Sequence, residues 1–86
     1  MQIEHTDVIK RKMQKAIKKR ILELLKERNM TKYRLSKITE MNPSTLTTIL
    51  HRKNSLPMFD TLYIICCGLG IELTEFFDSE MFTIKK

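Results

Sequence analysis

The chain has 86 residues, 42% of them apolar, and a formal net charge of +6, which together suit one small domain. No run approaches the about 18 apolar residues of a membrane span, and the N-terminus lacks the apolar core of a signal peptide. We therefore expect a cytoplasmic protein without a membrane partner. The two cysteines, Cys66 and Cys67, are adjacent and lack metal-ligand spacing, so we expect reduced thiols and no bound metal.

The charges are distributed unevenly along the chain. Residues 1–53 hold 14 Lys or Arg and 5 Asp or Glu, a balance of +9, whereas residues 54–86 hold 2 and 5, a balance of −3. A basic first part suits a protein that presents one side to a polyanion. The alternative, on charge alone, is a pattern that only keeps the chain in solution.

The N-terminal segment, residues 1–12, has no fold-defining pattern, and we expect it to be an arm. An early helical turn that starts at Thr6 and Asp7 is the alternative. The run Lys10–Lys12 has two interpretations as well: a basic arm that contacts DNA, or a plain solvated helix face. His5 is isolated, without a ligand partner at helical spacing.

A first helix is predicted over about residues 13–28. Its apolar residues step by three and four and form one inward stripe: Met13, Ala16, Ile17, Ile21, Leu24 and Leu25. Asn29 is typical of a left-handed helix stop, with Met30 folding back as the apolar residue that follows it.

Two short helices are predicted next, over about residues 32–39 and 43–50. Thr31 is a candidate N-cap for the first helix, and Asn42 followed by Pro43 is a strong start signal for the second. The inward residues of the two helices recur at helical spacing: Leu35, Ile38, Leu46, Ile49 and Leu50.

The outer face of helix 43–50 is small, polar and uncharged: Pro43, Ser44, Thr47, Thr48 and His51. Basic residues bracket it: Lys32, Arg34, Lys37, Arg52 and Lys53. Because cations hold phosphates and small polar groups meet base edges, this arrangement suits the major groove of DNA. Ser44 and Thr48 are the best candidates for base contacts. No Arg or Gln occupies the middle of the helix, so we expect DNA shape to contribute to recognition.

A fourth helix is predicted over about residues 58–69, with Gly70 ending it. Its core stripe is Phe59, Leu62, Ile65, Cys66 and Leu69. Ile64 and Cys67 make this helix apolar on further faces, and such a helix is buried on more than one side. We expect a second chain to cover these two residues. Cover by the chain's own tail is the alternative.

A short fifth helix is predicted around residues 73–77, and a tail follows over residues 79–86. Phe82 and Ile84 alternate with polar residues, which favours a short strand or an extended segment. This segment would pack on Ile64 or pair with its counterpart in a dimer. The candidate dimer-interface residues are therefore Ile64, Cys67, Phe82 and Ile84.

From about residue 17 to residue 78, the chain resembles the phage-repressor helix-turn-helix family (Cro and lambda-repressor-like, XRE). The resemblance rests on an ordered set of short matches: Leu35-Ser36, Met41, Ser44-Thr45-Leu46, Ile49, Pro57, Asp60-Thr61-Leu62, Leu69-Gly70-Ile71 and Glu75-Phe76-Phe77-Asp78. Two residues depart from the family pattern. Glu40 stands where the turn usually has glycine, and Arg52 stands near another frequent glycine. A positive φ at Glu40 would cost some stability.

The resemblance implies an all-α, compact five-helix, lambda-repressor-like domain with a central helix-turn-helix. We expect three parts: an arm over 1–12, the DNA-binding domain over 13–78 and a tail over 79–86. The resemblance also implies that Asn42 and the outer face contact DNA and that Lys53, Asn54 and Ser55 contact phosphates. The expected DNA-binding residues are Thr31, Lys32, Arg34, Asn42, Pro43, Ser44, Thr47, Thr48, His51, Arg52, Lys53 and Asn54.

Three functions compete on this sequence. The first is a sequence-specific transcriptional regulator, expected to be a repressor and a homodimer, that binds double-stranded DNA. The alternative is an antitoxin-like or other protein-interaction module in the same fold, which a long segment beyond the domain would favour. An enzyme is not expected, because there is no glycine-rich phosphate loop, no pair of carboxylates in apolar surroundings and no nucleophile with a base. We expect no cofactor and no small-molecule ligand.

Overall fold

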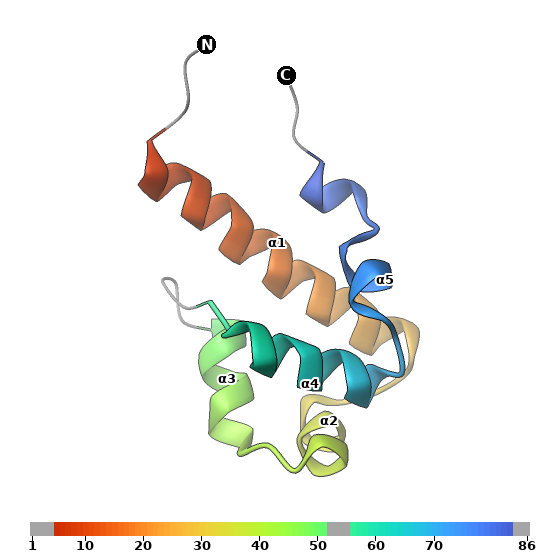
Figure 1. Ribbon diagram of the computed structural model, residues 1–86. Coiled ribbons are helices and arrows are strands. Elements are labelled where there is room, and N and C mark those ends of the chain that lie inside the picture. The colour runs from red at the N-terminus through yellow and green to blue at the C-terminus, as the bar shows by residue number, and fades with distance from the viewer. Residues whose placement is uncertain (1–4, 52–55, 84–86) are drawn as a thin grey trace.

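The computed structural model describes residues 5–51 and 56–83, and the regular structure within these ranges is helical throughout. The elements in chain order are α1 (Thr6–Glu27), α2 (Lys32–Thr39), α3 (Pro43–His51), α4 (Phe59–Leu69), α5 (Leu73–Phe77) and the 3-10 helix η1 (Glu80–Phe82). Figure 1 shows α1 above, α4 in the middle and the pair α2–α3 below, with α5 and η1 beside α1. The predicted all-α, five-helix class is confirmed for this part of the chain. None of the helices described is long and apolar enough to cross a membrane.

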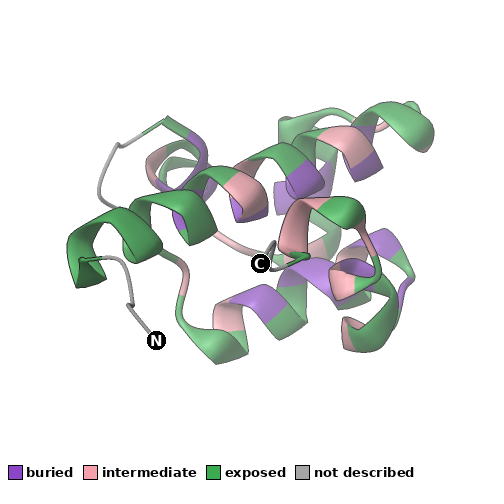
Figure 2. Cartoon of the chain, turned by 90° about the horizontal axis from the view of Figure 1, so that it is seen from above, coloured by how far each residue is buried: buried purple, intermediate pink, exposed green. Residues whose placement is uncertain are grey.

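Helix α1 begins at Thr6, well before the predicted start at Met13. The carbonyl oxygen of His5 accepts hydrogen bonds from two backbone amides of the first turn, at 3.0 and 3.1 Å. Asp7 also lies in the first turn, where a carboxylate interacts favourably with the helix dipole. From Thr6 onward, the segment that we expected to be an arm is therefore helical. Its first turns are exposed (Figure 2). No buried stripe at helical spacing therefore marks this part of the helix in the sequence.

The end of α1 follows the predicted pattern. Asn29 has a φ of 50°, in the left-handed region. The amide of Met30 donates to the carbonyl oxygen of Leu25 at 2.9 Å, and the Met30 side chain packs on the core. The predicted left-handed stop is confirmed, and it turns the chain toward α2.

One hydrophobic core joins the helices. Its buried members are Ile17, Ile21, Leu24, Leu25, Leu35, Leu46, Ile49, Leu50, Leu62, Ile65, Cys66, Leu69, Ile71 and Phe76. Most of them belong to the predicted apolar stripes, because a stripe at helical spacing has few other places to go. Burial, and secondarily the neighbouring Cys67 thiol, raises the pKa of Cys66 to about 11, so this core thiol is neutral.

Three apolar residues that we expected to face the core are exposed: Met13 (42%), Ile38 (47%) and Phe59 (71%). Met13 belongs to the exposed first turns of α1. Phe59 is the first residue of α4, and because side chains lean toward the N-terminus of a helix, it projects past the core. Ile38 lies at the edge of α2, whose buried residues are Leu35 and Ser36.

Gly68 sets the close packing of α4 on α2. A Cβ at this position would lie 2.5 Å from Thr39 Cγ2 and 2.8 Å from Leu35 Cδ1, closer than side chains tolerate. Only a glycine therefore lets α2 lie this near to α4. Two residues later, Gly70 ends α4 with a φ of 74°, as predicted.

Arg20 of α1 and Arg28, the residue that follows α1, bind the C-terminal ends of other helices, which the sequence pattern did not predict. Arg20, only 9% exposed, donates from Nε to the carbonyl oxygen of Phe76 (2.7 Å) and from Nη2 to that of Glu75 (2.8 Å). Arg28 Nε donates to the carbonyl oxygen of Leu69 (2.8 Å). The Glu75 carbonyl oxygen also accepts from the backbone amide of Asp78 at 3.2 Å, and the guanidinium groups add hydrogen bonds to these helix-end carbonyls. Both arginines are thereby committed to the fold.

Within the described part of the tail, residues 79–83, Glu80–Phe82 form a 3-10 helix, so the predicted strand or extended segment is wrong at Phe82. The Phe82 ring lies 6.0 Å from that of Phe76 and 4.9 Å from that of Phe77, centroid to centroid. This aromatic contact outweighs the alternation in the sequence and turns Phe82 onto its own chain. Ile84, the other tail residue expected in a dimer interface, lies outside the described residues.

Candidate nucleic-acid interface

The N-terminus of α2 is capped as predicted. Thr31 Oγ1 accepts a hydrogen bond from the backbone amide of Arg34 at 3.0 Å, while Thr31 itself has extended backbone angles. The cap places the side chains of Lys32 and Arg34 in the first, exposed turn of the helix. Backbone amides and cations therefore meet at this end of α2, which suits an anion.

The turn between α2 and α3 passes through Glu40, which has φ 60° and ψ 20°. This is the positive φ that the glycine preference at this position suggested. Thr39 Oγ1 donates to the carbonyl oxygen of Leu35 at 2.8 Å and accepts from the amide of Met41 at 3.3 Å. These bonds and the packing of Met41 on the core hold the turn despite the strain at Glu40.

The start of α3 is confirmed in the predicted form. Asn42 Oδ1 accepts hydrogen bonds from the Ser44 backbone amide (2.9 Å) and from the Ser44 hydroxyl (2.8 Å). Pro43 is the first helical residue, where the missing N–H costs nothing. The cap fixes the direction in which α3 leaves the turn.

Helix α3 separates an apolar face from a polar one. Leu46, Ile49 and Leu50 are buried, as predicted. The predicted outer residues Pro43, Ser44, Thr47 and His51 are exposed, and Thr48 is half-buried. Thr45, which the sequence pattern left unassigned, is exposed too, so the polar face is wider than expected.

The two outer threonines bond to their own helix. Thr47 Oγ1 donates to the carbonyl oxygen of Pro43 at 3.1 Å, and Thr48 Oγ1 donates to that of Ser44 at 2.9 Å. Each hydroxyl proton is therefore in use, and the oxygens remain as acceptors beside the threonine methyl groups. Such a surface can accept from amino groups of adenine or cytosine and can meet the methyl group of thymine.

A contact across the surface joins the first turn of α2 to the last turn of α3. Lys32 Nζ lies 3.0 Å from His51 Nε2, both on exposed side chains. The ammonium group has no lone pair and can only donate in this contact. We call the outer face of α3 (Pro43, Ser44, Thr47, Thr48 and His51) the reading face. The contact brings the predicted cation Lys32 and the predicted polar residue His51 together at one end of it.

Tyr33 is a residue of this surface that sequence reasoning missed. It is 62% exposed, and Lys37 Nζ lies 5.2 Å from the centre of its ring. An aromatic residue between two basic ones in α2 was the available signal. Three residues expected at the interface, Arg52, Lys53 and Asn54, lie outside the described residues, as does Ser55.

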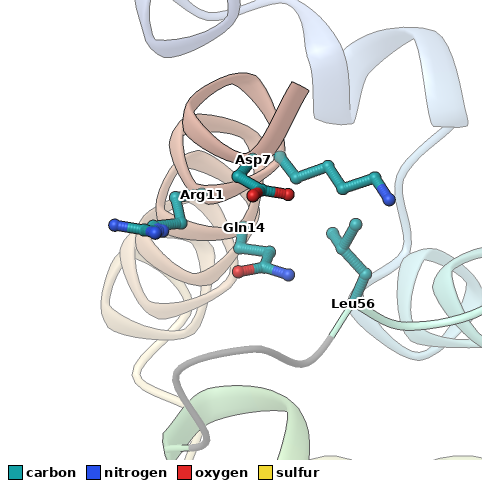
Figure 3. A pocket seen from close by; sticks show the side chains of 5 residues that line it. Asp7, Arg11, Gln14 and Leu56 are labelled. Atoms are coloured by element: carbon teal, nitrogen blue, oxygen red, sulfur yellow. The ribbon is translucent and has the colours of Figure 1, made fainter. Parts of the chain in front are cut away.

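A hollow of about 540 Å³ lies beside α1, away from the outer face of α3. Its lining residues are Asp7, Lys10, Arg11, Gln14 and Leu56, and Figure 3 shows their side chains. Gln14 is only 8% exposed, and its Oε1 has no hydrogen-bond partner within the described residues. In the same part of the chain, no three His, Cys, Asp or Glu side chains are placed to hold a metal ion.

The chain matches one family model, described as the Cro/C1-type HTH DNA-binding domain, over residues 20–80. The match includes the capped α2, the strained turn at Glu40 and the whole of α3. No curated protein and no solved structure matches the chain.

Proposed function

The chain belongs to the Cro/C1-type helix-turn-helix DNA-binding family, and on this premise we propose that it is a sequence-specific transcriptional repressor. It binds double-stranded DNA by inserting α3 into the major groove, and its occupancy of an operator blocks transcription. A DNA target agrees with the cytoplasmic location that we expect from the sequence. The proposal involves binding without catalysis and requires no cofactor.

The observation that carries this proposal is the outer face of α3. It is exposed, uncharged and made of small side chains, so the backbone of α3 can approach base edges closely. Lys32, Arg34 and Lys37 on the neighbouring helix are exposed, and we expect them to contact the phosphates that flank the groove. An exposed helix face without charged side chains is expected where another surface approaches it closely.

The proposed roles follow from chemistry and position. Asn42, Ser44, Thr47 and Thr48 meet bases, with Ser44 and Thr48 as the main reading residues. Thr31, Lys32, Arg34 and His51 anchor phosphates, together with Arg52, Lys53 and Asn54 of the loop that follows α3. Because the central turns of α3 hold no Arg or Gln, the shape of the DNA contributes to specificity.

A homodimer on a two-fold operator completes the proposal. Two copies would place their recognition helices one helical turn of DNA apart, about 34 Å. The exposure of Ile64 (39%) and of Cys67 on α4 supports an interface on that helix. Apolar side chains that stay exposed in a monomer often mark such a contact.

The decisive experiment is selection of binding sites from random duplex DNA, at low salt and again at physiological salt. We expect a short palindromic motif that survives physiological salt. Binding without a motif, erased by salt, would refute sequence-specific reading, because contacts to phosphates alone behave in that way.

A protein-interaction module in the same fold is the second candidate. The exposed apolar residues of α4, Phe59, Tyr63 and Ile64, favour it, because a partner chain would bury them. Failure of the selection combined with a defined heteromeric complex would establish this function instead.

A further inference from the structure

An open groove of about 770 Å³ lies between the start of α4 and α5. Its apolar floor is made by Phe59, Leu73 and Phe77. Three exposed carboxylates line it as well: Glu72, Glu75 and Asp78. Phe59 is 71% exposed, so a large aromatic surface is left in water beside concentrated negative charge. This combination suits a partner that is both apolar and basic.

The first turns of α1 carry the complementary pattern. Ile9 and Met13 lie one turn apart on the same side, 44% and 42% exposed. At about 100° per residue, Lys12 and Lys10 flank this apolar row on its two sides. Every residue from Thr6 to Met13 is exposed (Figure 2), so the apolar row of Ile9 and Met13 is left in water. We call residues 6–13 the α1 arm.

We propose that in the homodimer the α1 arm of each copy docks into the acidic groove of the other. The inference rests on the homodimer proposed above and names its surface. An arm does not reach the groove of its own chain, because α5 is bound to α1 at Arg20. Arg20 follows the end of the arm by seven residues, or about 10 Å of rigid helix at 1.5 Å per residue.

Reciprocal exchange gives a closed assembly. If each arm occupies the groove of the partner, the same patches meet twice around a two-fold axis, and no surface remains to recruit a third copy. A stable interface buries about 1,200–2,000 Å² in total, and the two contacts would divide this area between them. The apolar row supplies affinity, and the lysines and carboxylates set its direction.

The groove is continuous with the candidate interface on α4. Phe59, Tyr63 and Cys67 follow one another at intervals of four residues, so they form one row along the helix, and all three are exposed. Ile64 lies beside this row. An arm seated against Phe59 would therefore bring the second copy next to the apolar residues that the homodimer has to cover.

Exchange of charges tests the docking. The arm variant is Lys10→Glu with Lys12→Glu, and the groove variant is Glu72→Lys with Asp78→Lys. Sedimentation equilibrium of the full chain without DNA should show a wild-type dimer, and each variant alone should have a dissociation constant raised at least about tenfold. An equimolar mixture should recover the wild-type affinity, because both contacts of the mixed dimer then join opposite charges. All four side chains are exposed, and thermal melts check that each variant is folded.

Three results would overturn the docking: a monomeric wild type at the highest concentration reached, variants that dimerise like wild type, or a mixture that does not recover. A dimer that survives both reversals and is lost in Ile64→Glu would move the interface to the outer face of α4 alone. Binding of single half-sites keeps the two proposals apart, because it needs one copy only. Kept half-site preference with failed docking would leave DNA reading intact.

Discussion

At the residue scale, the reading face of α3 presents small polar side chains. The hydroxyl protons of its threonines are hydrogen-bonded to the helix backbone, so the face offers acceptor oxygens and methyl groups. It has no guanidinium group that could bind a base through two hydrogen bonds. Each such contact discriminates between bases less than a bidentate arginine does, because a single hydroxyl makes fewer and weaker bonds. We therefore expect specificity to be spread over several small side chains and over the shape of the DNA.

Thr48→Ala and Ser44→Ala should each reduce sequence preference. We expect the ratio of specific to non-specific affinity to fall about tenfold, equivalent to about 1.4 kcal/mol, because a base contact is removed and phosphate contacts stay. Arg34→Ala is the matched comparison, and it should weaken binding to all sequences alike. Fluorescence anisotropy with operator and scrambled duplexes measures both effects. The reverse pattern would contradict the division into reading and anchoring residues.

Glu40→Gly should stabilise the domain. The residue has a φ of 60°, which costs a non-glycine residue about 1 kcal/mol. The entropy that glycine adds to the unfolded chain offsets part of the gain in stability. The midpoint of thermal unfolding should rise by a few degrees, about 2–4 °C for a domain of this size. Glu40→Gln is the control, since it removes the charge and keeps the strain. An equal rise in both variants would mean that charge, and not backbone strain, is responsible.

At the scale of elements, the position of α2 and α3 depends on how α4 receives them. Gly68 allows close contact with Leu35 and Thr39, and the caps at Thr31 and Asn42 set the ends of the two short helices. Helices of eight and nine residues are unstable alone, so they persist through this packing. The orientation of the reading face is thus controlled from a helix that does not belong to it.

Gly68→Ala should destabilise the domain by about 1–3 kcal/mol, because the new Cβ overlaps Thr39 and Leu35. Alanine favours the helix by about 1 kcal/mol, and the overlap outweighs this gain. Denaturant unfolding measures the change, with Cys67→Ala on the exposed side as the matched control. Adding Thr39→Ser removes the nearest methyl group and should restore part of the loss. A neutral Gly68→Ala variant would show that α2 shifts easily.

At the scale of the whole molecule, the cations have separate tasks. Arg20 and Arg28 bind carbonyl oxygens of the fold, and the proposed docking engages Lys10 and Lys12. We propose that the basic residues of α2, together with Arg52 and Lys53, contact DNA. The formal charge of +6 is therefore a poor measure of the surface that meets phosphates.

Operator affinity should fall steeply with salt. With about five phosphates neutralised per copy, the slope of log K against log salt should be about −9 for a dimer, from about −0.9 per phosphate. Titrations between low and physiological salt measure it, and Arg34→Ala should make the slope less steep by about 1.8 in the dimer. A dimer slope near −1 would contradict the phosphate contacts assigned to these cations.

Local signals in the sequence were sufficient for most of the helices and for the recognition motif. The caps at Thr31 and Asn42, the left-handed stop at Asn29 and the stripe Leu46, Ile49 and Leu50 all act within a few residues, so their effect can be predicted without the fold. The family's preference for glycine at residue 40 likewise indicated the strained turn there. The sequence by itself thus determined the helical class and which face of α3 is polar.

Only the tertiary structure decided which apolar residues are covered and which cations are occupied. Phe59 and Met13 fit helical stripes, yet both stay exposed in the folded chain. Arg20 finds its partners 55 and 56 residues away, and Phe82 leaves its alternating pattern to join Phe76 and Phe77. Burial and long-range hydrogen bonds depend on what the rest of the chain brings near a residue. Periodicity along the sequence carries no information about that proximity.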